Sequence, residues 1–370
     1  MSSNNSLRLP SYTDPFPKHR PYVLEAEQGE TLAVVGGGTV RYLATREETS
    51  NAFGLVQSRG GPDERVLPHF HNGAHDTWLV LKGAVRLWAG DQSRILLPGD
   101  FAYVPPKITH SYQVVGADTE FLGVISPGAW VEFFKLLGEP CDETPTYKGL
   151  NEKTLDKKWL IEQIKMGHDI VPQFQYNWPE VNEGADNVLP DGMAPYFLRS
   201  DTGPKYLLNG QSNTPLCRNV NSDGNFSISV IAGNGPKSKY PSFTRSKEAF
   251  QSGPFVEGKM IRFGSTHTLF RVIEGFFDFE VREADGNVHK ETISANESIM
   301  VSAGNAFRYS VSSAYGRMYS FAGKGSGLEE VFVKLGRVAK RNEMVGETDD
   351  EEVSVEDLNA AVKEIGAEYI

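Results

Sequence analysis

Residues 67–112 read LPHFHNGAHDTWLVLKGAVRLWAGDQSRILLPGDFAYVPPKITHSY and hold four of the eight histidines of the chain. Apolar residues fall there in short runs separated by Gly, Pro, Asn and Asp, which is typical of short strands joined by tight turns. Histidine and carboxylate side chains, which ligate metals, stand beside these runs at His69, His71, Asp76 and His110. The stretch therefore predicts a metal site inside a small β-barrel.

The spacing of these residues predicts how they meet. Residues i and i+2 of a strand point to the same side, so His69 and His71 project together. The Asn-Gly pair that follows is a strong hairpin signal, and on the returning strand Asp76 and His75 lie on opposite faces. We expect Asp76 to lie beside the two histidines and His110 to join them from a neighbouring strand. His75 is not expected to be a ligand.

Three imidazoles and one carboxylate suit one divalent transition metal. Cu, Fe, Mn, Ni and Zn all remain open, because the same ligands serve several ions and availability decides among them. The alternative interpretation is four unrelated polar residues at strand ends. A lone HxH would favour that alternative, but the later Gly83 and the second group of Gly99, Pro105 and His110 argue against it.

The rest of the chain predicts an all-β protein with two β-sandwich or jelly-roll barrels. Short alternating segments run from about residue 22 to 126 and again from about 206 to 323. Each series ends in a helical pattern, GAWVEFFKLLG at 128–138 and GLEEVFVKLG at 327–336, which indicates an internal duplication. The predicted parts are a metal-binding barrel over 1–138, an irregular connector over 139–200 with one helix at about 152–166, a second barrel over 201–336, and an acidic tail with a final helix over 337–370.

Composition excludes several classes of protein. The formal charge of −11 argues against nucleic acid and against anionic membranes, because both need a basic face. Two cysteines exclude a disulfide scaffold. The N-terminal residues contain no apolar signal segment, and no apolar run approaches the ~18–20 residues of a membrane span, so we expect a cytoplasmic protein. A homodimer stays open.

The motif spacing resembles that of the cupin family. Its first motif has Gly, HxH, three or four residues, Glu, six residues and Gly, and its second has Gly, five residues, Pro and then His. The matching positions in this chain are His69, His71, Asp76, Gly83, Gly99, Pro105 and His110. The chain departs from the pattern at one ligand, where Asp76 stands in the place of the usual Glu.

Within that family, the chain resembles the fungal quercetin 2,3-dioxygenases, which are bicupins. The similar segments are RPYV at 20–23, AFGLV at 52–56, LPHFH at 67–71, KG at 82–83, LWA at 87–89, PGD at 98–100, TEFLGVISPG at 119–128 and GPKYL at 203–207. The resemblance implies a divalent metal, often copper, on His69, His71 and His110, an aromatic small-molecule substrate, and O2. The Glu of that group also accepts the flavonol hydroxyl proton, so Asp76 is expected to act as a ligand or as the general base.

By motif register, six residues would form the substrate wall. They are mostly apolar or aromatic, as suits a flat hydrophobic ligand, although filling of the barrel core is the alternative for each one alone. Trp78 and Tyr112 are favoured for ligand contact. The six residues are Val56, Ser58, Trp78, Tyr112, Phe121 and Ile125.

The second repeat has lost the ligand types. When Gly275 is aligned with Gly83, the four ligand positions become Ile261, Phe263, Thr268 and Phe307. We therefore expect one working metal centre, in the first barrel, and a structural role for His267.

The sequence leaves three functions open. The first is a metal-dependent dioxygenase that oxidises or cleaves an aromatic, flavonol-like molecule with O2. The second is a metal-dependent isomerase, cyclase or lyase of secondary metabolism that consumes no O2. The third is a cupin that binds a small ligand without turnover.

Overall fold

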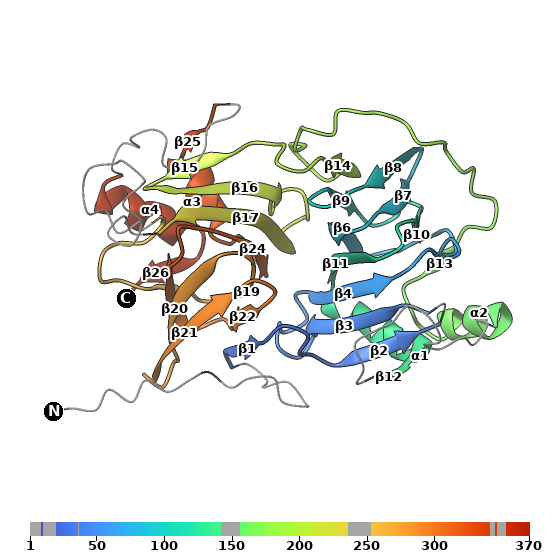
Figure 1. Cartoon of the computed structure of the whole chain (residues 1–370), viewed down its shortest axis with the longest axis horizontal. Coiled ribbons are helices and arrows are strands. Elements are labelled where there is room, and N and C mark those ends of the chain that lie inside the picture. Colours follow the sequence, from blue (N-terminus) through green and yellow to red (C-terminus); the bar gives the residue numbers. More distant parts are fainter. Residues whose placement is uncertain are drawn as a thin grey trace. The chain divides into compact units, whose positions relative to one another are not determined.

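The computed structural model describes residues 9, 20–35, 37–141, 156–235, 253–340, 345 and 353–370. The prediction of an all-β protein is confirmed, because antiparallel strands form four sheets (Figure 1). The contacts divide the chain into two compact units, one of residues 29–203 and 220–223 and one of residues 1–28, 204–219 and 224–370. We call the first unit the first barrel and the second unit the second barrel.

The first barrel has an eight-stranded sheet and a five-stranded sheet. In order, the larger sheet contains β12 (Gly138–Pro140), β2 (Thr31–Val34), β3 (Thr39–Ala44), β4 (Gly54–Gly60), β11 (Thr119–Ser126), β6 (His75–Lys82), β9 (Phe101–Val104) and β14 (Tyr196–Leu198). The smaller sheet contains β13 (Val171–Pro172), β5 (His69–Phe70), β10 (His110–Val114), β7 (Val85–Ala89) and β8 (Gln92–Leu96).

The second barrel repeats this arrangement. Its larger sheet contains β1 (Tyr22–Leu24), β22 (Ser298–Val301), β19 (His267–Glu274), β24 (Tyr315–Gly323), β17 (Phe226–Asn234), β16 (Gln211–Cys217), β15 (Tyr206–Leu208) and β25 (Arg337–Val338). Its smaller sheet contains β21 (Val288–Ser294), β20 (Phe276–Arg282), β23 (Ala306–Val311), β18 (Ile261–Phe263) and β26 (Ala367–Tyr369).

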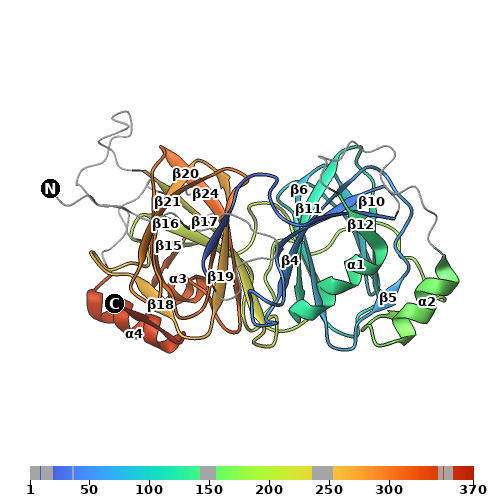
Figure 2. The same cartoon turned by 90° about the horizontal axis from the view of Figure 1, so that it is seen from below.

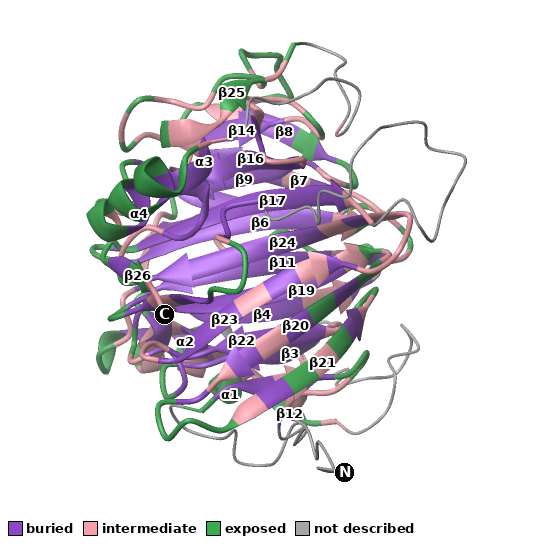
Figure 3. Ribbon diagram, turned by 90° about the vertical axis from the view of Figure 1, so that its left-hand side faces the viewer, coloured by how far each residue is buried: buried purple, intermediate pink, exposed green. Residues whose placement is uncertain are grey.

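Alternation of side chains along the strands builds the two cores. On β20 buried residues alternate with more exposed ones, so one face of the strand lies inward (Figure 3). The first core is small and gathers Trp78, Val80, Leu87 and Phe121. The second core is larger and rich in phenylalanine.

Short helices close each series of strands, as the duplication predicted. The 3-10 helix η1 (Gly128–Phe133) and α1 (Phe134–Leu137) follow β11, and α3 (Glu329–Leu335) follows β24. The connector helix α2 (Lys157–Lys165) begins after Asp156, whose side chain accepts hydrogen bonds from the N–H groups of Lys158 and Trp159. Residues 152–155, at which that helix was expected to start, lie outside the described residues.

The two compact units differ from the predicted domain ranges at both ends of the chain. β1 is an edge strand of the second barrel, where Val23 pairs with Ile299, although residues 1–138 were expected to form one part. After the helix α4 (Val355–Glu364), which begins at the expected cap Ser354, β26 pairs with β18 of the same unit. Most of the acidic run at 346–357 lies outside the described residues.

The connector is less irregular than expected. It contributes β13 to the smaller sheet of the first barrel and β14 to the larger one, while β12 forms that sheet's opposite edge. Strands of two or three residues carry too little alternation to be detected in a sequence. Among the helices of the described ranges, none is long and apolar enough to cross a membrane.

Phe307 is suited to a test of how tightly the second core is packed. It is 1% exposed, and its ring centroid lies 5.3 Å from that of Phe270. We expect Phe307→Ala to lower the free energy of unfolding by about 3–5 kcal/mol, because the cavity would not be filled. The matched control is Phe276→Ala on β20, which removes a half-exposed ring and should change stability by about 0.5 kcal/mol or less. Urea unfolding measures both variants, and equal effects would contradict this description of the core.

Candidate metal centre

The four predicted ligands come together between the two sheets of the first barrel. His69 begins β5 and pairs in register with His110 at the start of β10, so a neighbouring strand does complete the set. His71 follows β5, and Asp76 is the second residue of β6. All four are buried, and their ligand atoms lie within 4.8 Å of one another.

The turn between His71 and Asp76 differs from a two-stranded hairpin. β5 belongs to the smaller sheet and β6 to the larger one, so the chain crosses from one sheet to the other at residues 72–74. This crossing brings Asp76 in from the opposite side of the barrel. The expected proximity of Asp76 to the histidines is therefore produced by a change of sheet.

Main-chain carbonyl groups orient all three imidazoles. Nδ1 of His69 lies 2.7 Å from the carbonyl oxygen of Leu67, and Nδ1 of His110 lies 2.9 Å from that of Ile108. Nδ1 of His71 contacts the carbonyl oxygen of Asp169 in the same way. Because a carbonyl oxygen only accepts, Nδ1 carries the hydrogen in each ring, and Nε2 is the nitrogen that can bind a metal.

The Asp76 carboxylate lies among these Nε2 atoms. Its Oδ2 is 3.0 Å from Nε2 of His71 and 3.0 Å from Nε2 of His110. The shorter Asp side chain is therefore long enough to place Oδ2 beside two of the nitrogens that could bind a metal.

Burial and neighbouring charge act on the ionisation of the site in opposite directions. Burial, together with the other two imidazoles, holds the pKa of His69 well below its ordinary value. Burial alone would lower the pKa of His71, but the Asp76 carboxylate raises it. Burial would likewise raise the pKa of Asp76, but His71 and His110 lower it, so the carboxylate is ionised at neutral pH.

Two buried atoms of the site lack hydrogen bonds. Oδ1 of Asp76 has no partner, and Nε2 of His110 approaches Asp76 without the geometry of a hydrogen bond. An unsatisfied buried polar atom costs ~1–3 kcal/mol, more if charged, so native proteins seldom leave one without a reason. A cation bound between the carboxylate and the imidazoles would satisfy both atoms. The donor set therefore fits a divalent transition metal.

Three of the six predicted wall residues form an aromatic row leading away from His110. The ring centroids of Trp78 and His110 are 5.7 Å apart, those of Trp78 and Tyr112 are 6.0 Å apart, and those of Tyr112 and Phe121 are 5.6 Å apart. Burial raises the pKa of Tyr112 to about 12, so its hydroxyl stays protonated. The row therefore places tilted aromatic rings next to the four candidate ligands.

The other three wall residues lie on the adjoining strands of the larger sheet. Ile125 pairs in register with Asp76, and Ser58 pairs with Phe121. Val56 pairs with Gly123, which lies between those two positions on β11. Val56 and Ile125 are buried, whereas Ser58 is half-buried.

His75 lies outside the donor set, as expected. Its Nδ1 is 2.8 Å from the hydroxyl of Tyr103, which in turn donates to the carbonyl oxygen of Asn221. In the second barrel, the positions aligned with the ligands are Ile261, Phe263, Thr268 and Phe307. Ile261 pairs with Phe307, just as His69 pairs with His110, and the Phe263 and Phe307 rings stack.

Sequence reasoning missed Asp169 of the connector and Trp130 of η1. Asp169 accepts hydrogen bonds from the turn that follows His71, and Nε1 of Trp130 donates to its carbonyl oxygen at 3.3 Å. Burial would raise the pKa of Asp169, but the N–H donors of the turn lower it. Asp169 lies 98 positions after His71 in the chain, so no local sequence motif connects the two residues.

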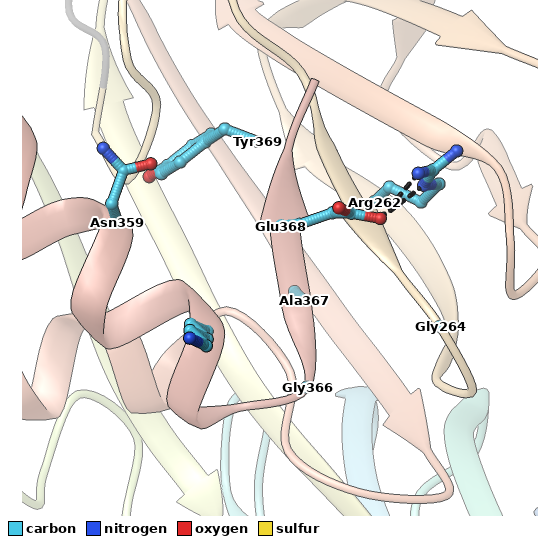
Figure 4. Close-up of a pocket in the computed structure, with 8 residues that line it drawn as sticks. Arg262, Gly264, Asn359, Gly366, Ala367, Glu368 and Tyr369 are labelled. Atoms are coloured by element: carbon cyan, nitrogen blue, oxygen red, sulfur yellow. Dashed lines mark hydrogen bonds and ion pairs between the residues drawn. The ribbon is translucent and has the colours of Figure 1, made fainter.

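A surface groove of about 490 Å³ lies in the second barrel (Figure 4). It runs between α4 and β26, and a salt bridge of 2.6 Å joins Arg262 to Glu368 at its edge. None of the four candidate ligands lines this groove.

The comparisons with known proteins agree with this description. Residues 60–125 match the family model of the cupin domain. Quercetin 2,3-dioxygenase of Bacillus subtilis is 36% identical over 120 residues, which cover 32% of this chain and 35% of that protein. Quercetin 2,3-dioxygenase of Aspergillus japonicus is 27% identical over 218 residues, or 52% of this chain and 62% of that protein. The matches thus span about a third of one relative and under two thirds of the other.

The chain was also aligned with a solved structure of Bacillus subtilis oxalate decarboxylase. The alignment covers 82% of this chain and 77% of the decarboxylase chain, with a TM-score of 0.49 and 17% sequence identity. The cupin motifs, the cupin-domain match over residues 60–125 and the duplicated barrel together support a bicupin of the cupin superfamily.

Proposed function

We propose that the chain is a metal-dependent dioxygenase that oxidises or cleaves an aromatic, flavonol-like small molecule with O2. His69, His71 and His110 would hold one divalent metal, with Asp76 as a further ligand or as the general base. The observation that carries the proposal is the buried set of three imidazoles and one carboxylate beside an aromatic row. The similarity to two quercetin 2,3-dioxygenases supports the reaction class.

The residues of the first barrel would have different roles in this reaction. A bound divalent transition metal would supply a Lewis acid and a redox-active centre. If Asp76 acts as the general base and Oδ1 is not bound to the metal, this oxygen, which has no hydrogen-bond partner in the structure, would accept the hydroxyl proton of the substrate. Deprotonation makes the aromatic substrate electron-rich and therefore easier for O2 to oxidise.

The proposed substrate wall would bind and orient a flat molecule. Trp78, Tyr112 and Phe121 offer ring faces and edges, and aromatic contacts of this kind favour offset or edge-on packing. Val56, Ser58 and Ile125 would contact the substrate from the adjoining strands. The apolar surroundings would exclude water from the reacting atoms, which strengthens electrostatic interactions there.

A second candidate rests on the replacement of the usual cupin Glu by Asp76. A metal-dependent isomerase, cyclase or lyase would use Asp76 as base and the same three histidines, but would not consume O2. Such a reaction needs proton transfer at a polarised substrate and no oxidant.

The ligand assignment predicts the metal content of variants. We expect His69→Ala and His110→Ala to lose the metal after dialysis, because each removes one inward-facing Nε2. His75→Gln is the matched control and should keep it, because His75 bonds to Tyr103 instead. Elemental analysis of the purified proteins measures this. Full metal content in His69→Ala would refute the assignment.

Metal affinity should fall as the pH falls. His71 must lose its proton to become a ligand, and Asp76 raises its pKa above the ordinary value of 6.5. Below that raised pKa, protons compete with the metal for Nε2, so the apparent affinity should drop at least about tenfold per pH unit. Titration with Co²⁺ at several pH values measures the slope. An affinity that stays constant from about pH 7 to 5.5 would contradict a role for His71.

Oxygen uptake separates the two candidate reactions. The metal-loaded protein, tested with a panel of flavonols in an oxygen electrode, should consume O2. Asp76→Ala should abolish uptake even where the metal remains, whereas Asp76→Glu should retain part of it because the family's usual carboxylate returns. Conversion of a substrate without O2 uptake would overturn the dioxygenase in favour of the second candidate. Binding without conversion would indicate a protein that only binds its ligand.

A further inference from the structure

We propose that Asp169 is a positioning residue that fixes His71, and the turn leading to Asp76, in the orientation for metal binding. Asp169 belongs to the connector and is not itself among the four metal-binding residues. The inference rests on the proposed metal site, and it gives the connector a part in that site.

The carboxylate of Asp169 holds the turn between two of the proposed ligands. Oδ1 accepts hydrogen bonds from the main-chain N–H of Asn72 at 2.7 Å and from its side-chain Nδ2 at 3.1 Å. Oδ2 accepts from the N–H groups of Gly73 at 2.9 Å and Ala74 at 3.0 Å. Charge-assisted bonds to a carboxylate are stronger than neutral ones. One side chain therefore fixes the three residues at which the chain changes sheet.

The main chain of the same residue orients the ligand ring. The carbonyl oxygen of Asp169 accepts the Nδ1 hydrogen of His71, which leaves Nε2 facing Asp76 at 3.0 Å. Nε1 of Trp130 donates to the same oxygen at 3.3 Å, and its ring centroid lies 5.0 Å from that of His71. Asp169 thus acts on His71 at the ring and also through the turn that follows it.

The structure also anchors Asp169. Its neighbour Ile170 is buried in a small core with Phe133 of η1 and with Leu160 and Ile164 of α2. Figure 2 shows α2 and α1 on the side of the first barrel that carries β5. C-terminal to Asp169 and directly after Ile170, β13 pairs with β5, so that Val171 lies opposite Phe70, whereas α2 lies N-terminal to Asp169 in the chain. The connector is therefore attached on both sides of the residue that holds the turn.

This arrangement predicts a specific defect. If the Asp169 side chain is removed, the N–H groups of the turn lose their shared acceptor, while the main-chain carbonyl of residue 169 still accepts from His71. The positions of His71 and Asp76, at the two ends of the turn, are then held less firmly. Loss of the outer hydrogen bonds that orient metal ligands typically weakens metal binding 10- to 100-fold. A purely structural residue of the connector would lower stability without changing the geometry of the metal site.

The test uses the full chain and Cu²⁺ alone, with affinity measured by titration and ligand geometry by electron paramagnetic resonance. We expect Asp169→Ala to bind Cu²⁺ about 10- to 100-fold more weakly, with altered hyperfine splitting. Asp169→Asn keeps the size of the side chain but loses one oxygen, so it should lie between Asp169→Ala and the unchanged protein. If Asp169→Ala does not fold, Asp169→Asn carries the test on its own.

Asp186→Ala is the matched control. Asp186 also fixes the connector to the strands of the first barrel, through a salt bridge of 2.8 Å with Arg94 of β8 rather than through a metal-site residue. It pairs with Arg199 within the connector at 3.5 Å. The substitution should lower the melting temperature and leave the Cu²⁺ spectrum unchanged.

The outcomes separate this inference from the proposed function. An affinity and a spectrum equal to those of the unchanged protein in both Asp169 variants would overturn the positioning role and leave the metal site intact. An equal spectral change in Asp186→Ala would also overturn it, because any loosening of the connector would then suffice. If the unchanged protein binds no Cu²⁺ through these histidines, the proposed function fails, and this inference fails with it.

Discussion

The burial of the Asp76 carboxylate is the constraint around which the first barrel is built. A carboxylate can be buried in ionised form only if positive charge or hydrogen-bond donors replace the water it loses. Three imidazoles lie around it, two on strands of the opposite sheet and one in the turn that follows β5, and a main-chain carbonyl at Nδ1 orients each ring. The arrangement suits a cation as the shared partner of all four groups.

The second barrel shows the same fold without this constraint. Its larger and smaller sheets repeat the first, yet Ile261 and Phe307 occupy the places of the paired histidines His69 and His110. Stacked and tilted phenylalanine rings fill that interior. Apolar packing alone therefore supports this type of barrel, and the polar cluster of the first barrel is available for chemistry.

Much of this organisation could be predicted from the sequence because it depends on local spacing. Alternation in the strands gave the all-β class, and the HxH pair gave two ligands on one face. The repeated closing helix revealed the duplication. The pairing of His110 with His69 required only that two strands be neighbours, as observed.

The parts that sequence reasoning missed depend on contacts between distant segments. β1 joins the second barrel through pairing with β22, more than 270 positions further along the chain. The strand β13 has only two residues, too few to show an alternation of apolar and polar side chains, and its partner β5 is equally short. Asp169 has no local signature either, because its partners are N–H groups of a turn that any Asp could approach.

Anomalous X-ray diffraction from crystals of the metal-loaded chain would test the assignment of the metal centre. We expect one strong peak within bonding distance of Nε2 of His69, His71 and His110, on the side facing Asp76, with no matching peak at Ile261 and Phe307. A peak outside this cluster, or a fully loaded protein in which these imidazoles point away from the metal, would contradict it.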